Sequence, residues 1–354
     1  MFRLFMYKNT DKLILLYSGD ISKVEDSVNN ESRSVIIVDL VTGIFLCILI
    51  SLAILVLKNQ RVNDKLTSLT YTKIHTAEDL ANIKNDPKGH YILKADIDMT
   101  GVTWTPFTFE GTLDGDGHKI KNLKVLTVGN ARETTYDGNM KGYDTCFAAM
   151  FDVLRGGKVK NLTLENYEAE ITSDQPCFAG SIAGFTDNAL VRDCKVSGKI
   201  TFRAHDRMFG TGGIAGYGTG RFESIDSDMV LICIDTDRAN KDEQFMGGAL
   251  AAGFPDLVKC NIRIDGYASE HGYAHNGGLI GLYMIYPKGY QYEGTFDTNN
   301  VTGKITFFED NEDRRAYCKP FVGELMNRII HERNNTHSFE SKEVFTYDTD
   351  LMPA

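Results

Sequence analysis

Among the aspartates that stand two residues apart in this chain of 354 residues, three pairs are considered first, because paired carboxylates can perform acid–base chemistry or bind Ca²⁺. In a strand, this spacing places both side chains on one side. One pair lies in the glycine-rich run LDGDGH, a pattern typical of a turn, so we interpret it as structural. The other two pairs show the same spacing without further support. The three pairs are Asp114 and Asp116, Asp235 and Asp237, and Asp348 and Asp350.

Signatures of other catalytic classes are missing from the sequence. No GxSxG nucleophile elbow occurs, and the glycine-rich runs lack the lysine of a phosphate-binding loop. The seven cysteines show no metal-ligand spacing, and Cys194 and Cys260 are expected to be buried thiols rather than disulfides or ligands. We therefore expect no catalytic residues, no metal site and no cofactor.

Aromatic side chains gather in one stretch of the chain and form the candidate binding residues. Exposed tyrosine rings stack on sugar faces and often anchor contacts between proteins. This stretch is also a long insertion between repeats. The alternative, which we favour, is that the loop packs its own tyrosines against the body of the protein. The six candidates are Tyr273, His275, Tyr283, Tyr286, Tyr290 and Tyr292.

The overall charge excludes one class of partner. The net charge is −10 at pH 7, and no basic block is present that could neutralise nucleic-acid phosphates. We therefore expect no nucleic-acid partner, and a basic protein or a neutral glycan fits the charge better.

A segment near the N-terminus is apolar enough to span a bilayer. Residues 35–57 contain the run LVTGIFLCILISLAILVL, which has no charged residue. At about 1.5 Å per residue, a helix over 35–57 crosses about 30 Å of hydrocarbon. We predict a transmembrane helix here, after a polar segment (1–34) and before a spacer (58–74). By the positive-inside rule, the lysines and arginines that follow this segment favour a cytoplasmic location for the C-terminal part of the chain. Large domains, however, translocate largely regardless of nearby charge.

Glycine-containing repeats fill the body. Apolar runs such as TGGIAGY and NGGLIGL recur, and their leading glycines, Gly180, Gly212, Gly247 and Gly277, are spaced by 32, 35 and 30 residues. A unit of strands and turns this size buries its apolar face only by stacking on its neighbours. We predict an all-β, right-handed parallel β-helix over 75–327, with the glycines at tight corners or at positive φ. Propeller blades need longer units and are the weaker alternative.

Both ends of such a solenoid need cover, because open strand edges invite pairing with other chains. The run from Thr76 to Asp79 has the form of a helix-capping box, so a short helix is placed to cap the first coil. Segment 328–354 is the predicted cap or tail at the other end. One inward-facing column is expected to pass through Leu162, Cys194, Ile225, Cys260 and Asn299.

The run YILKADIDMTGVTWTPFTFEGTLDGDGHKIKNLKV resembles the opening coil of GLUG-motif proteins, and GGIAGY and GGLIGL resemble the GLUG repeat. Such coils occur in bacterial surface proteins and in the N-terminal region of streptococcal IgA1-protease-like zinc metallopeptidases. The resemblance implies a β-helix and a body outside the cell. It does not carry over the protease activity, since the HExxH zinc motif is missing: the pair His331–Glu332 is followed by Asn335 where the second histidine would stand.

Together these observations predict a surface protein anchored in the cell membrane by residues 35–57. Its solenoid would mediate adhesion or bind glycan or protein ligands without catalysis. Two alternatives stay open: a polysaccharide lyase or hydrolase, which needs a carboxylate cluster on one face, and a structural stalk related to a larger surface peptidase.

Overall fold

The computed structural model describes two compact units, Met1–Thr70 and Tyr71–Ala354. In the first unit, β1 (Phe5–Asn9) and β2 (Lys12–Leu16) pair as an antiparallel hairpin. The predicted transmembrane segment, 35–57, lies outside the described residues. Within the part of the chain that is described, no helix is long and apolar enough to cross a bilayer. The described residues are 5–9, 12–16, 71–128, 145–204, 208–235, 243–270, 273–284, 293–309, 316–326 and 329–344.

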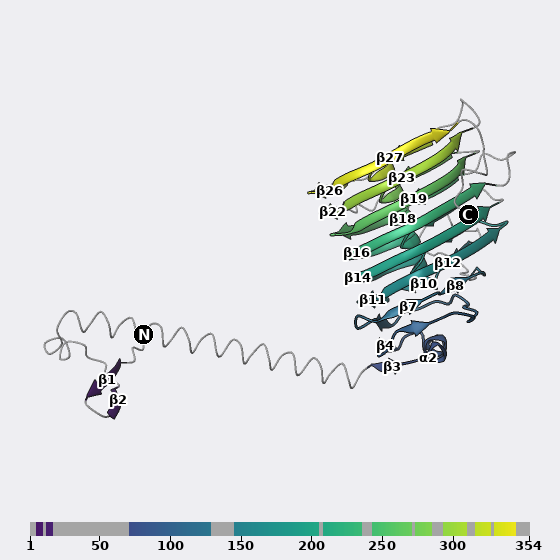
Figure 1. Cartoon of the computed structure of the whole chain (residues 1–354). Helices are drawn as coiled ribbons and strands as arrows, with labels where there is room; N and C mark the ends of the chain where they lie inside the picture. Colours follow the sequence, from purple (N-terminus) through teal and green to yellow (C-terminus); the bar gives the residue numbers. More distant parts are fainter. Residues whose placement is uncertain are drawn as a thin grey trace. The chain divides into compact units, whose positions relative to one another are not determined.

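The second unit is the predicted parallel β-solenoid. All the described strand pairings in it are parallel, and they form a 19-stranded sheet and a six-stranded sheet. Figure 1 shows these strands stacked coil on coil. The first coils use short strands: β3 (Thr72–Ile74), β4 (His90–Leu93), β5 (Ile97–Asp98), β6 (Thr112–Asp114), β7 (Lys119–Lys121) and β8 (Lys124–Val125).

Later coils repeat one plan, in which a short strand of the six-stranded sheet is followed by one or more strands of the large sheet. The short strands are β9 (Cys146–Ala148), β13 (Cys177–Ala179), β15 (Met208–Gly212), β17 (Glu243–Gly247), β20 (Tyr273–Gly277) and β24 (Ala316–Lys319). The strands of the large sheet in these coils are β10 (Phe151–Arg155), β11 (Lys158–Lys160), β12 (Thr163–Ser173), β14 (Ala183–Ala204), β16 (Ala215–Asp235), β18 (Leu250–Val258), β19 (Asn261–Glu270), β21 (Ile280–Met284), β22 (Glu293–Asp297), β23 (Asn300–Glu309), β25 (Val322–Met326), β26 (Ile329–Arg333) and β27 (Thr336–Val344).

The repeat glycines stand where the backbone leaves no room for a side chain, and their φ angles are not positive. The left-handed region contains none of the four leading glycines. A Cβ on Gly212 would overlap the carbonyl oxygen of Ala215, and one on Gly247 would overlap that of Leu250. The chain therefore turns from the short strand into the long one so closely that backbone fills the space of a side chain.

A second corner of the coils does have a residue with positive φ, and that residue is mostly not a glycine. In successive coils the left-handed residue stands immediately before the inward-facing column, with φ between 52° and 59°. Asparagine and aspartate tolerate this conformation better than other non-glycine residues, which explains three of the six positions. The residues are Asn161, Asp193, Ser224, Lys259, Thr298 and Asn334.

The predicted inward column is confirmed. Leu162, Cys194, Ile225, Cys260 and Asn299 are each at most 1 % exposed. The buried amide of Asn299 is satisfied, because its Oδ1 accepts from the Cys260 backbone N–H at 3.0 Å and its Nδ2 donates to the Leu257 carbonyl at 2.9 Å. Cys194 and Cys260 are buried thiols, as expected.

The two ends of the solenoid are built differently. At the first coil, α2 (Ala77–Asn82) continues into a 3₁₀ turn (Ile83–Asn85), and the capping box of Thr76 and Asp79 is formed by two 3.1 Å hydrogen bonds. At the last coil, β26 and β27 pair with β22 and β23, so the solenoid extends to Val344 and the predicted boundary at 327 falls inside its final coil.

The final coil carries polar side chains where earlier coils carry apolar ones. His337 and Ser341 stand in register with the buried Val301 and Ile305 of β23. A terminal repeat that faces water tolerates polar side chains at such positions.

Candidate ligand-binding face

One outward-facing surface of the solenoid is formed by neighbouring strands that run in parallel: β7, β12, β14, β16, β19 and β23. Side chains alternate along each strand, so Val196 and Ile262 point into the core while their neighbours point out. The same positions in successive coils are in register. The outward residues therefore form straight rows across the strands, spaced by about 4.8 Å.

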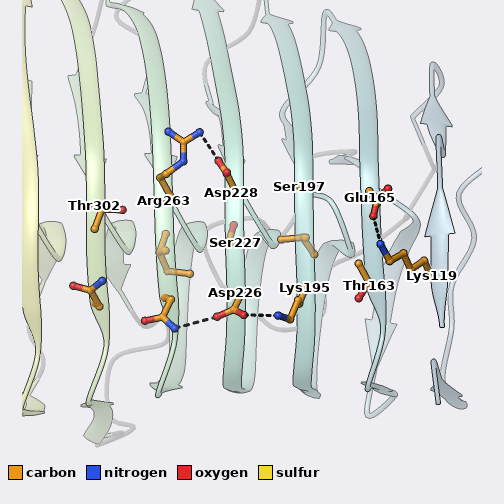
Figure 2. A pocket seen from close by; sticks show the side chains of 14 residues that line it. Lys119, Thr163, Glu165, Lys195, Ser197, Asp226, Ser227, Asp228, Arg263 and Thr302 are labelled. Atoms are coloured by element: carbon orange, nitrogen blue, oxygen red, sulfur yellow. Dashed lines mark hydrogen bonds and ion pairs between the residues drawn. The ribbon is translucent and has the colours of Figure 1, made fainter. Parts of the chain in front are cut away.

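Two such rows define what we call the long-strand face. The first row is Lys119, Thr163, Lys195, Asp226, Asn261 and Asn300, and the second is Ser197, Asp228, Arg263 and Thr302. Together with Glu165 they line a shallow, open groove of about 640 Å³, shown in Figure 2.

Charges on the long-strand face are paired between neighbouring coils. Lys119 Nζ lies 2.6 Å from Glu165, Lys195 Nζ lies 3.2 Å from Asp226, and an Arg263 guanidinium nitrogen lies 2.8 Å from Asp228 (Figure 2). Water and salt screen exposed pairs of this kind, so they add little to stability and their main effect is to order long side chains. The face is thus polar but locally neutral, with hydroxyl and amide groups between the charges.

One carboxylate of this face, that of Asp226, is held in the ionised form. The Asn261 amide, which donates to Asp226 at 3.0 Å, and the nearby Lys195 hold the pKa of Asp226 below its usual value. Glu165 raises the pKa of Lys119. An acid catalyst of glycoside cleavage needs the opposite, a carboxyl whose pKa is raised. The arrangement suits hydrogen bonding to a polar ligand better than proton transfer.

Two of the six aromatic candidates lie in the core rather than on the surface. His275 is 4 % exposed and Tyr283 is fully buried. The His275 ring stacks between Phe245 and Tyr317, with centroids 5.3 Å and 5.7 Å away. Burial excludes both from the role of exposed contact residue. Tyr273 begins β20 but its side chain lies outside the described part, as do Tyr286, Tyr290 and Tyr292.

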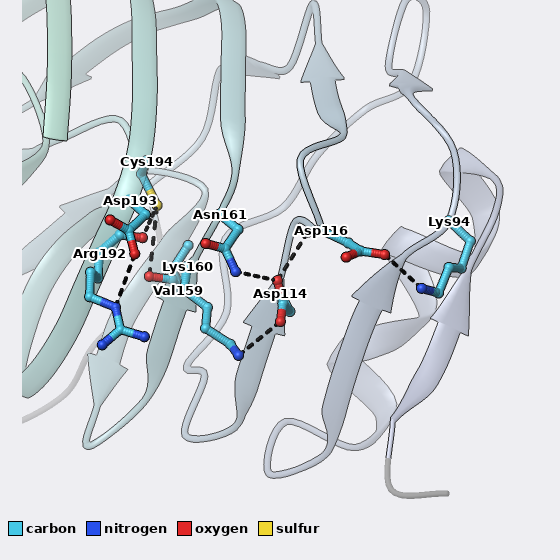
Figure 3. Close-up of polar contacts among 9 residues, drawn as sticks. All are labelled: Lys94, Asp114, Asp116, Val159, Lys160, Asn161, Arg192, Asp193 and Cys194. Carbon is cyan, nitrogen blue, oxygen red and sulfur yellow. Dashed lines mark hydrogen bonds and ion pairs between the residues drawn. The ribbon is translucent and has the colours of Figure 1, made fainter. Parts of the chain in front are cut away.

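The Asp114–Asp116 pair forms a turn, as interpreted from the sequence. Asp116 has φ of 50°, and its N–H donates to Asp114 Oδ1 at 3.0 Å. Figure 3 shows Lys160 and Asn161 of the next coil also directed at Asp114, with Lys160 Nζ at 2.8 Å. Burial raises the pKa of Asp114, but these partners outweigh it and the net shift is downward. Asp237, Asp348, Asp350 and the Asp235 side chain lie outside the described residues.

His331 lies in β26, an exposed strand, with Nε2 2.7 Å from Glu293. In the HExxH motif the two histidines coordinate zinc from one face of a helix, so a strand at this position does not provide that geometry. No group of three or more histidine, cysteine or acidic side chains suited to a metal ion is found among the described residues.

Comparison with known proteins returns IgA1-protease-like structures. No model of a protein family matches this chain, and no curated protein does. The solved structure of "IgA1 Protease" is similar over 78 % of this chain and 20 % of its own length, with 16 % identity and a TM-score of 0.47. A candidate immunoglobulin A1 protease from Bacteroides ovatus is similar over 77 % of this chain and 76 % of its own, with 14 % identity and a TM-score of 0.39.

At identities of 16 % and 14 %, these similarities concern the fold alone. The chain spans about a fifth of the length of the first of these structures.

Sequence reasoning missed the long-strand face because it weighed aromatic clusters above rows of small polar residues. A signal for it was present. The near-identical runs VSGKITF and VTGKITF place Ser197 and Thr302 at matching positions in the second row, on strands of different coils.

Proposed function

We propose that this protein is a membrane-tethered surface protein whose long-strand face binds an extended polar ligand, a glycan or a protein segment, without catalysis. The observation that carries the proposal is the register of the outward rows. Thr163, Lys195, Asp226 and Asn261 follow one another on adjacent strands. A ligand laid across the coils would meet a donor or acceptor about every 4.8 Å.

Three features of the face support binding over bond cleavage. It is open and shallow, it carries balanced charge, and the pKa of Asp226 is lowered by its partners. Balanced charge avoids the cost of desolvating unpaired ions when a ligand covers the face. The apolar run in 35–57 supports the tether, and the GLUG-like coils support an extracellular position.

Binding can be tested with the full-length chain in detergent on an array of neutral and acidic oligosaccharides, extended with mucin and serum glycoproteins. We expect retention of at least one ligand class. Lys195→Glu places a second carboxylate beside Asp226 and should weaken that binding at least tenfold through like-charge repulsion and loss of a donor.

The matched control is Lys158→Glu, which makes the same change at an exposed lysine on β11, outside the groove. It should bind like the unmodified chain. Equal binding by Lys195→Glu and Lys158→Glu, or no retention of any probe by the unmodified chain, would show that the long-strand face is not the site.

A further inference from the structure

Two cysteines stand side by side at the start of the six-stranded sheet. Cys146 on β9 is in register with Cys177 on β13, and the two strands are parallel. Register partners on parallel strands place their side chains on the same face of the sheet, with Cα atoms about 4.8 Å apart. A disulfide requires Cα atoms about 4.4–6.8 Å apart, so the backbone already meets this requirement.

The other described cysteines are in register with residues of other types. Cys194 is in register with Ile225, which separates it from Cys260 in the inward column. Cys233 stands between Phe202 and Ala268 on the neighbouring strands. Cys318 is in register with Asn276. Among the described residues, Cys146 and Cys177 are therefore the two cysteines that the fold places in register on adjacent strands.

The edge position of β9 gives the pair access to a reagent. Among the described strands, β9 is the outermost of its sheet, and Cys146 is its first residue. Cys146 is 6 % exposed, and its Sγ donates to Oε1 of the exposed Gln175 at 3.3 Å. Cys177 is fully buried. A small oxidant would thus reach Cys146 first, and an edge strand can move the short distance that closing an S–S bond requires.

We propose that Cys146 and Cys177 form a disulfide when the chain meets an oxidising thiol–disulfide buffer, such as glutathione disulfide. The Cys146 thiolate attacks glutathione disulfide, giving a mixed disulfide and one glutathione thiolate. The Cys177 thiolate then attacks the Cys146 sulfur and releases the second glutathione. Two cysteine thiols are oxidised and one glutathione disulfide is reduced to two glutathiones. The bond joins two neighbouring coils at the edge of the sheet.

Formation of the Cys146–Cys177 disulfide is expected to be slow. Burial raises the pKa of the Cys177 thiol well above its usual value, so the second attack waits for rare deprotonation or for a local opening of the edge strand.

The test is to incubate the reduced full-length chain, folded in detergent, with glutathione disulfide at mildly alkaline pH. The protein is then alkylated, digested without reductant and analysed by mass spectrometry. We expect a linked peptide pair containing Cys146 and Cys177 that a reductant separates. Cys177→Ser should stop at a glutathione adduct on Cys146, whereas Cys194→Ser, the matched control, should form the linked pair like the unmodified chain.

Two results would overturn the proposal. One is a lasting glutathione adduct on Cys146 in the unmodified chain while Cys177 stays available for alkylation after unfolding. The other is that both thiols stay unmodified in protein whose circular dichroism shows that it is folded. Linkage of the remaining cysteine to another site in Cys177→Ser would reveal scrambling during digestion and count against the assignment as well.

Discussion

At the level of single residues, equivalent positions of successive coils form columns, and the position within the repeat determines whether a side chain is buried. The inward column was predictable because each member lies at the same offset in its repeat. Tyr283 and His275 were considered for ligand contact because of their chemistry alone. Aligning the repeats would have placed His275 in register with Phe245, and Phe178 with Phe147, in an aromatic column.

The buried imidazole of His275 leads to a prediction about pH. Burial lowers its pKa from 6.5 to about 4, although Glu324 Oε2 lies 2.8 Å from Nδ1. The unfolded chain binds a proton near its ordinary pKa while the folded chain does not, so protonation favours unfolding. The stability that the neutral ring provides is present above about pH 6.5 and is lost as the pH falls toward about 4. The loss is on the order of 2–3 kcal/mol.

His275→Phe should remove this dependence while extending the stack formed by Phe245 and Tyr317. Thermal unfolding midpoints measured from neutral to mildly acidic pH should fall less for the variant than for the unmodified chain. Groups that titrate in both proteins, such as Glu243, contribute to both curves and largely cancel in the difference. Parallel curves for the two proteins would contradict a neutral buried imidazole.

At the level of elements, the sequence located the corners but not the physical reason for each. Glycine spacing marked the turn between short and long strands, and the capping box marked α2. The left-handed corner at Ser224, Lys259 and Thr298 has no signal in residue type, because stacking on the neighbouring coil fixes that backbone. The face itself depends on register between strands about 30 residues apart, which local propensity cannot set.

The close approach at the glycine corners can be measured. Gly212→Val would put its Cβ against the Ala215 carbonyl oxygen and within 2.8 Å of Leu250 in the next coil, so two layers of backbone must move. We expect destabilisation of about 3 kcal/mol or more, seen as a lower midpoint in thermal or denaturant unfolding.

Gly101→Ala is the control for backbone strain without crowding. Gly101 has φ of 75°, and among the described residues no atom beyond its chain neighbours lies within 4 Å of the place where its Cβ would stand. It should cost about 1–2 kcal/mol through left-handed strain alone. Equal effects of Gly212→Val and Gly101→Ala would mean that the corner at Gly212 is not tightly packed.

At the level of the whole molecule, the period and strand character of the repeats were enough to predict a parallel solenoid. They did not locate its end, because the final coil replaces apolar inward residues with polar ones such as His337 and therefore resembles a tail in sequence. The placement of the body relative to a membrane depends on residues 35–57 and on their flanks. The flanking charges favour a cytoplasmic body, whereas the GLUG-like coils favour a body outside the cell.

We expect the body to be on the outer side, because a large folded domain translocates largely regardless of nearby lysines, and the positive-inside rule weighs short loops most. Protease added to intact cells of the native host should then digest residues 71–344, and deleting 35–57 should release the chain from membranes. A cytosolic protein probed in the same cells controls for lysis. Digestion only after lysis would place the body inside, where a surface ligand could not reach the long-strand face. Continued sedimentation of the deletion variant with membranes would mean that a second attachment exists besides the apolar segment.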